Sequence, residues 1–211
     1  MLASIENGIQ LAVTCGCAVI ALYYGVVHKE RILVLLGLFY GVFFLGDLYW
    51  QLYIVFYDNA APAFYIPYFS RYSAYMFLLL LLIYVNVKNT EDYQFRFRPM
   101  YLLIPLFTFG MGALYMQYGS YLSNIVAALL MTGLIWHAVY GLSYLRKHPE
   151  QTNRRRMLYV ATLVFCGIEY AMWTVSSFAT GEFYNIYYWL DLLLSLSFLL
   201  FLPAARKAVG V

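Results

Sequence analysis

The chain has 211 residues, of which 64% are hydrophobic and 11% are charged. This composition excludes an ordinary soluble domain, in which about 25% of the residues are charged. A net charge of +3 does not indicate a nucleic-acid-binding protein, because the basic residues lie in short gaps between apolar runs, where membrane proteins carry them.

Seven apolar runs follow one another, each close to the ~20 residues that a helix needs to cross a bilayer. In chain order they cover residues 6–27, 32–57, 65–87, 99–118, 120–145, 156–180 and 184–205. The sequence therefore predicts an all-α integral membrane protein with seven transmembrane helices in a single domain over residues 1–211. The N-terminal run carries Glu6 and no basic segment, so we do not expect a cleavable signal peptide.

The Lys and Arg residues predict the orientation of these helices. All but Arg71 lie in the gaps after the first, third, fifth and seventh runs, and the other gaps contain neither residue type. Because short cytoplasmic loops are rich in Lys and Arg, we expect the N-terminus outside and the C-terminus in the cytoplasm. The predicted location is the plasma (cytoplasmic) membrane, which the chain would cross several times.

Residues 1–88 and 120–205 look like two copies of a three-helix unit, with run 99–118 as the connector. Asp47 in the second run corresponds to Glu169 in the sixth, and Arg71 in the third corresponds to Asp191 in the seventh. A single connecting helix would give both units the same orientation, as in transporters built from parallel repeats. Chance similarity between membrane helices rich in Tyr and Leu is the alternative explanation.

Four ionisable residues lie inside the predicted spans: Asp47, Arg71, Glu169 and Asp191. At a rise of 1.5 Å per residue, they lie about 9–16 Å from the outer ends of their helices. A charged side chain at the middle of a bilayer costs at least about 2.5–3.5 kcal/mol, so we expect these residues to face one another rather than lipid.

Helical spacing adds polar and aromatic side chains to these four charges. The predicted ligand-binding residues are Asp47, Gln51, Arg71, Tyr75, Glu169, Trp173, Tyr187, Asp191 and Ser195. Three carboxyl groups accompany one guanidinium, so either a carboxyl group keeps its proton or a cationic ligand or ion supplies the missing charge. Alternatively, Arg71 joins the helices through ion pairs and binds no ligand.

No pattern in the sequence indicates an enzyme. No Ser or Cys has a partnered base in a known motif, and His28, His137 and His148 are too dispersed to converge on a metal. We therefore expect no catalytic residue, no metal and no cofactor, and a structural role between helices for His137.

The arrangement of three helices, a connector and three further helices resembles the superfamily of the SWEET and PQ-loop solute carriers. The same superfamily holds the nicotinamide riboside transporters and, by proposed descent, the microbial rhodopsins. The Pro-Gln pairs of the PQ-loop carriers and the tryptophan motifs of the riboside transporters are absent from this chain.

The third, sixth and seventh runs resemble a microbial rhodopsin more concretely. The pair Arg71-Tyr72 precedes a leucine run as in the rhodopsin third helix, Trp173 matches a retinal-pocket tryptophan, and Asp191 matches the acidic residue of the seventh helix. The residue four positions after Asp191 would carry the retinal, but it is Ser195, and no lysine lies within a span. The resemblance thus implies a rhodopsin-like fold without covalent retinal.

These patterns predict a small-solute transporter with its site in the outer half of the bundle, coupled to protons through a carboxyl group such as Glu169. One alternative is a rhodopsin-like receptor or sensor that signals through a cytoplasmic protein docked near residues 154–156. Another is a structural subunit of a membrane complex. The expected partners are the lipid bilayer, a small-molecule ligand, and a cytoplasmic protein or a second copy of the chain, but no nucleic acid.

Overall fold

The structure is a computed structural model that describes residues 2–57, 66–89, 99–146, 152–178 and 186–210. These residues form seven α-helices and one short 3-10 helix, and none of them forms a strand. The helices are α1 (Leu2–Val27), α2 (Arg31–Tyr57), α3 (Ile66–Asn89), α4 (Leu103–Tyr115), α5 (Tyr121–Leu145), α6 (Thr152–Phe178) and α7 (Ile186–Val209), and η1 (Pro99–Leu102) precedes α4. The predicted all-α fold with seven helices is confirmed.

Six of these helices are long and apolar enough to cross a membrane: α1, α2, α3, α5, α6 and α7. This supports the prediction of a multi-pass membrane protein. The fourth helix is shorter than the run 99–118 from which it was predicted, because residues 99–102 form a 3-10 turn and the α-helix ends at Tyr115. Its described helical segment, Pro99–Tyr115, falls below the length of the other six.

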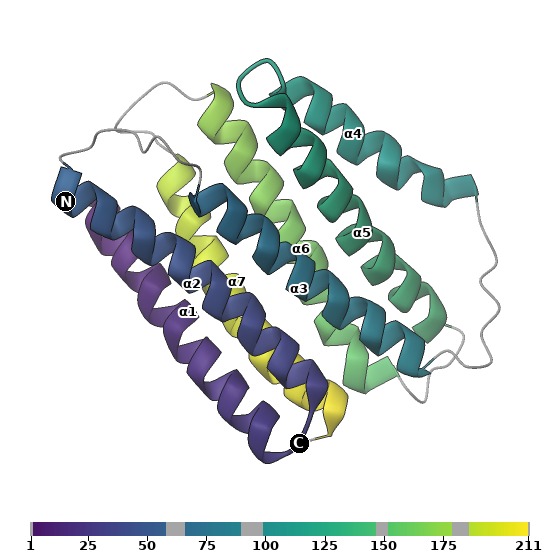
Figure 1. The fold of residues 1–211 in the computed structure, drawn as a ribbon. Helices are drawn as coiled ribbons and strands as arrows, with labels where there is room; N and C mark the ends of the chain where they lie inside the picture. Colours follow the sequence, from purple (N-terminus) through teal and green to yellow (C-terminus); the bar gives the residue numbers. More distant parts are fainter. Residues whose placement is uncertain (1, 58–65, 90–98, 147–151, 179–185, 211) are drawn as a thin grey trace.

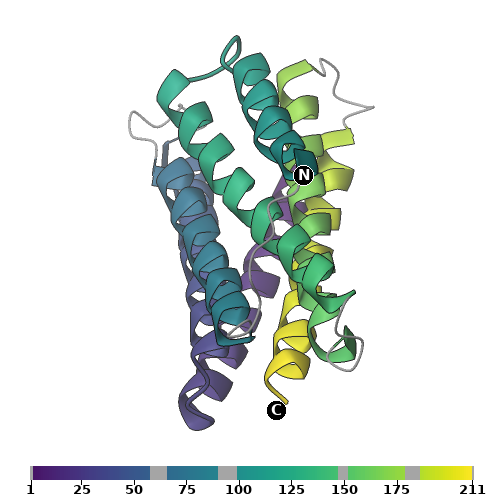
Figure 2. The same cartoon turned by 90° about the vertical axis from the view of Figure 1, so that its right-hand side faces the viewer.

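Consecutive helices run in opposite directions, so the chain begins at one end of the bundle and finishes at the other (Figure 1). Six helices form a closed ring in which α1 packs on α2, α2 on α3, α3 on α5, α5 on α6, α6 on α7 and α7 on α1. A further contact joins α2 to α7, and α4 packs outside the ring against α5 and α6. Figure 2 shows α2 and α3 on one side of the bundle and α6 and α7 on the other.

Phenylalanine rings fill the centre of the bundle between α2, α6 and α7. Phe39, Phe43, Phe165, Phe198 and Phe201 are each at most 2% exposed. Their contacting rings have centroids 4.8–6.2 Å apart, mostly in tilted or edge-to-face pairs, which suit the charge distribution of aromatic rings. We call these five residues the aromatic layer. It closes the space between the three helices.

A tyrosine hydroxyl ties the aromatic layer together. Tyr40, which is fully buried, donates a hydrogen bond of 2.5 Å to the backbone carbonyl of Phe198. This bond joins α2 to α7 directly across the ring of helices. Because the Tyr40 hydroxyl makes this hydrogen bond, its burial in the layer does not carry the free-energy cost of an unpaired polar group.

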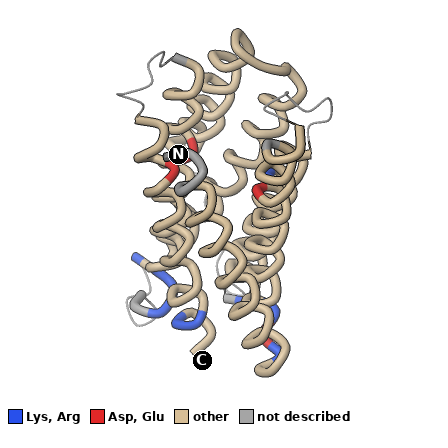
Figure 3. Tube along the Cα trace, turned by 90° about the vertical axis from the view of Figure 1, so that its left-hand side faces the viewer, with Lys and Arg blue, Asp and Glu red and all other residues tan. Residues whose placement is uncertain are grey.

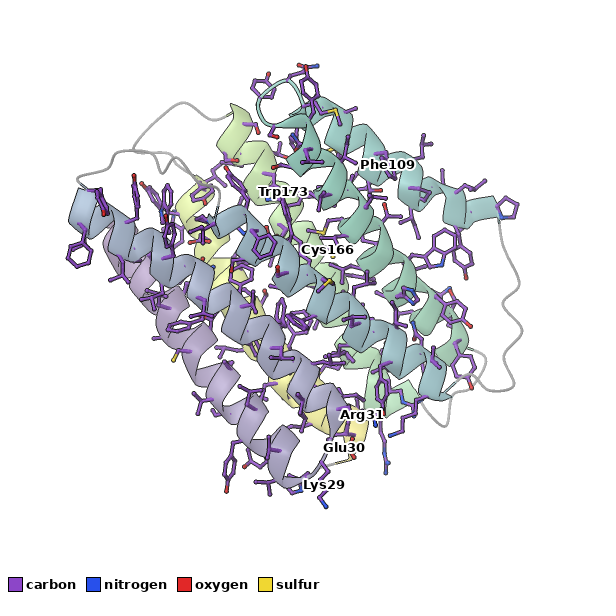
Figure 4. All side chains as sticks on the ribbon, viewed as in Figure 1. Lys29, Glu30, Arg31, Phe109, Cys166 and Trp173 are labelled. Atoms are coloured by element: carbon purple, nitrogen blue, oxygen red, sulfur yellow. The ribbon has the colours of Figure 1, made fainter. Side chains whose placement is uncertain are left out.

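Apart from Arg71, the Lys and Arg residues that the structure describes gather at one end of the bundle, close to the C-terminus (Figure 3). The turn Lys29, Glu30 and Arg31 lies at this end (Figure 4). Arg206 near the end of α7 places its guanidinium carbon 4.5 Å from the centroid of the Tyr24 ring at the end of α1. We call this the basic end.

Candidate ligand site within the bundle

The four charged residues predicted to lie inside the membrane come from four different helices, and electrostatic interactions connect them. Arg71 on α3 interacts with Glu169 on α6 and with Asp47 on α2. Asp191 on α7 acts on both Asp47 and Glu169. We call Asp47, Arg71, Glu169 and Asp191 the charge cluster. Its members lie beyond the aromatic layer as seen from the basic end.

A close helix contact fixes two members of the cluster. Gly46 and Ser70 immediately precede Asp47 and Arg71, and a Cβ atom on Gly46 would overlap the Ser70 side chain. The Ser70 hydroxyl also donates a hydrogen bond to the Val42 carbonyl, across the same interface. Small residues allow membrane helices to approach closely, so this contact holds α2 and α3 together at the level of the two charges.

Glu169 is the most deeply buried member of the cluster. Its residue is 0% exposed, and neither carboxylate oxygen has a hydrogen-bond partner among the described residues. The Tyr75 hydroxyl lies next to this carboxylate but outside hydrogen-bonding geometry, so it too is unpartnered in the described structure. Tyr75 is also fully buried. A buried polar group without a partner costs about 1–3 kcal/mol, so this arrangement does not stabilise the fold by hydrogen bonding.

Further buried polar atoms near the charge cluster also lack hydrogen-bond partners in the described structure. Within the described residues, Oδ2 of Asp47, Nε2 of Gln51 and Oγ of Ser195 have no hydrogen-bond partner. Gln51 lies one helical turn from Asp47, and Ser195, which is 1% exposed, lies one turn from Asp191. Native proteins satisfy about 90% or more of their buried polar groups, so such a concentration at one level requires an explanation.

Aromatic rings border the charge cluster on the side of the basic end. The Arg71 guanidinium carbon lies 5.6 Å from the centroid of the Phe43 ring. The Tyr75 ring is 5.7 Å from that of Phe165. Both contacts connect the cluster to the aromatic layer.

Two of the predicted aromatic residues differ in their placement. Tyr187 on α7 interacts electrostatically with Arg71, as expected for a residue that lines the cluster. Trp173 instead packs its ring on Tyr115 and Tyr170, at centroid distances of 6.1 and 5.4 Å. It lies toward α4 and borders a narrow crevice with Thr108 and Gly112. The described ring contacts of Trp173 are therefore with α4 and with its own helix, one turn beyond Glu169.

Gln10 on α1 is a residue that the sequence interpretation missed. Two glycine contacts set the antiparallel register of α1 against α2, because Gly25 lies against Val34 and Gly37 lies against Leu22. In this register Gln10 lies opposite residue 49. Its height along the bundle is therefore between those of Asp47 and Gln51. Gln10 is 3% exposed, and its Nε2 atom has no hydrogen-bond partner among the described residues. Its amide side chain within an apolar run was the signal that could have identified it.

A second polar group lies nearer the basic end, and its members are hydrogen-bonded. The Asn86 amide donates to the His137 carbonyl at 3.0 Å and lies 3.2 Å from Nδ1 of the same residue. The Tyr159 hydroxyl donates to Oδ1 of Asn86 at 2.6 Å. This network joins α3, α5 and α6, as expected of a structural histidine. No group of three His, Cys, Asp or Glu residues that could hold a metal occurs in the described part of the chain.

Comparison with known proteins gives no relative for this chain. No protein-family model, no curated sequence and no solved structure matches it. The resemblances to solute carriers and to microbial rhodopsins therefore stay predictions from the sequence. The function has to be argued from the charge cluster and its surroundings.

Proposed function

We propose that this protein is a membrane carrier for a small solute, which binds at the charge cluster. The main support is that three carboxyl groups and one guanidinium from four helices meet among buried polar atoms that lack partners in the described structure. Ionisable residues inside membrane proteins commonly mark substrate or ion pathways. An ion-pair network that served only to hold the helices would be expected to satisfy its hydrogen bonds.

Alternating access would arise from movement of one three-helix unit against the other. In each proposed unit the helices pack in chain order, α1 on α2 on α3 and α5 on α6 on α7. Whereas the contact of α2 with α7 has no counterpart of similar extent between α6 and α3, the contact of α3 with α5 becomes that of α7 with α1 when the two units are exchanged. This equivalence supports the parallel repeat, in which the charge cluster lies where α2 and α3 meet α6 and α7.

The proposed topology has the basic end in the cytoplasm, following the positive-inside rule. The chain between α3 and α5 returns along the length of the bundle, because α3 ends at the basic end and α5 begins at the opposite end (Figure 1). On this basis the segment that contains α4 makes the seventh crossing. With this topology the aromatic layer would lie between the site and the cytoplasm, as in a carrier that is closed on that side.

Glu169 is the proposed proton-coupling residue. It faces Arg71 and Tyr75 on α3 and Asp191 on α7, and it acts on Asp47 on α2 and on Cys166 on its own helix. Three carboxyl groups around one guanidinium leave an excess of negative charge when all are ionised. Binding of a proton at Glu169 reduces this excess, so proton occupancy and solute occupancy would be linked.

A receptor is the second candidate, and the aromatic layer favours it. A receptor needs a pocket that opens to one side only, and a ring layer that stays closed would provide this. In that case ligand binding would change the packing of α6 and α7 at the basic end, where a cytoplasmic partner would dock.

Uptake by purified protein in liposomes, under an imposed inward proton gradient, tests the carrier proposal. A panel of radiolabelled metabolites should contain at least one solute whose uptake requires the gradient and is lost in Glu169→Gln. Glu30→Gln, which removes a carboxylate at the basic end, is the matched control and should retain uptake. Binding of a solute without any uptake would favour the receptor instead.

A further inference from the structure

We propose that the ligand of the charge cluster is a small organic cation with an N–H ammonium group, held between the carboxyl groups of α2, α6 and α7. This inference rests on the proposed function, because it names the class of solute that the same site would take. The carboxyl groups are those of Asp47, Glu169 and Asp191, and Arg71 is the only cationic side chain found to interact with them in the described residues.

The hydrogen-bonding character of the site supports a donor-rich ligand. The unpartnered atoms include both carboxylate oxygens of Glu169 and one of Asp47, and these accept hydrogen bonds when they are ionised. The hydroxyl groups of Tyr75 and Ser195, both at least 99% buried and unpartnered, can accept as well. An ammonium group has three donors and no acceptor, so it complements such a set of atoms.

The charge balance points in the same direction. Arg71 offsets at most one of the three carboxylates, and it interacts electrostatically with Glu169 and Asp47. Asp47 on α2 and Asp191 on α7 add further negative charge when they are ionised. One or two ammonium groups would offset them, whereas an anionic solute would increase the repulsion inside a region of low dielectric constant.

The surroundings favour an organic cation over a bare metal ion. The carboxyl groups do not converge into a set of metal ligands in the described residues. The Tyr75 and Phe43 rings border the cluster, and Phe43 already contacts the Arg71 guanidinium. Aromatic faces attract organic cations and provide apolar contact for their carbon atoms.

The test is thermal unfolding of the detergent-purified protein with solutes that share one carbon chain: butylamine, 1,4-diaminobutane, butyrate and butyramide. A ligand that binds the folded protein raises its apparent Tm by mass action. We expect the two amines to raise Tm in a concentration-dependent manner, and butyrate and butyramide to have no effect. The inference would be wrong if neither amine raised Tm, or if butyramide raised Tm as much as the amines did.

Variants locate the binding site. Asp47→Asn and Asp191→Asn should each weaken amine binding about tenfold or more, as expected for the loss of a charge-assisted hydrogen bond. Glu30→Gln should bind amines as the unaltered protein does. Amine binding that is unchanged in both Asp variants would show that amines bind elsewhere, and it would contradict the proposal. Having two separate Asp variants keeps the test valid if one of them fails to fold.

Liposome uptake separates this inference from the carrier proposal. If amines bind but are never transported, the cationic ligand stands and the carrier proposal fails. If butyrate is transported and Glu169→Gln abolishes its uptake, the carrier proposal stands and the cationic ligand is wrong.

Discussion

The bundle holds two polar groups that differ in how their hydrogen bonds are met. Near the basic end, Asn86 bonds to both His137 and Tyr159 and thereby joins three helices. At the charge cluster, by contrast, Glu169 and Tyr75 are fully buried and lack hydrogen-bond partners in the described structure. A polar network that only stabilises helix packing is expected to be satisfied. The first group therefore resembles a structural network, and the unpartnered atoms of the second group are the basis of the binding role proposed above.

Replacement of Arg71, in the charge cluster, should lower the stability of the protein more than the other substitutions described below. Arg71→Gln removes the guanidinium that interacts with Glu169 and Asp47, and loss of the counter-charge of a buried carboxylate costs about 3–5 kcal/mol. We expect a large fall in Tm at neutral pH. The fall should be smaller at acidic pH, because protonation of carboxyl groups left without a counter-charge removes their mutual repulsion. Thermal unfolding across a pH series measures this, with Arg31→Gln as the control. Equal Tm values at every pH would contradict the cluster.

A substitution next to Tyr159, in the hydrogen-bonded network near the basic end, should have the next largest effect on stability. A Cβ atom on Gly141 would overlap the Tyr159 ring, whereas a Cβ atom on Gly41 meets nothing within 4 Å. Gly141→Ala should therefore destabilise the protein by about 1–3 kcal/mol, as overpacking does. Gly41→Ala, the matched control, should leave stability unchanged or raise it slightly. Thermal unfolding and ligand titration of both variants measure this. Loss of ligand binding in folded Gly141→Ala would show that the two groups are not independent.

Replacement of Asn86 tests directly whether the hydrogen-bonded network and the charge cluster are independent. Asn86→Leu deletes the hydrogen bonds to His137 and from Tyr159, and should lower stability by about 1–2 kcal/mol. Affinity for any ligand of the charge cluster should stay within a factor of about two, because uncoupled sites act independently. Isothermal titration of the unaltered and Asn86→Leu proteins checks this. A strong change in affinity together with unchanged stability would reverse the roles assigned to the two groups.

Neutralising Glu169 should have the smallest effect on stability and a large effect on function. Glu169→Gln still leaves Arg71 with Asp47 as a carboxyl partner, and it relieves the repulsion between Glu169 and Asp191, so stability should change by less than about 1 kcal/mol. Ligand binding should lose its dependence on pH. Titrations at neutral and mildly acidic pH, compared with Glu30→Gln, check this. A large loss of stability would indicate that Glu169 mainly serves the ion-pair network.

Much of the architecture could be predicted from the sequence, because a chain that crosses a membrane several times can adopt few arrangements of secondary structure. The helix bounds agree with the apolar runs to within a few residues, since a spanning helix must match the bilayer. The fourth helix was the exception. Apolar character alone did not reveal that Pro99–Leu102 form a 3-10 turn or that the helix ends at Tyr115.

The site could be predicted only in part. Charge is costly in a membrane, so the meeting of Asp47, Arg71 and Glu169 follows from the sequence. The direction of Trp173 does not, because its ring is held by Tyr115 on α4, and that contact depends on how α4 packs outside the ring. Gln10 was missed because the register of α1 against α2 decides its level, and glycine contacts set that register.

The contact between Arg71 and Phe43 has a consequence for how the protein responds to occupancy. Phe43 lies 4.8 Å from Phe198, so a single ring contacts both the charge cluster and the aromatic layer. If the proposed ligand draws the guanidinium away from this ring, its binding changes the packing energy of the layer. By reciprocity, a lipid or protein that binds more tightly when the layer is loosened would then change the affinity of that ligand by the same factor.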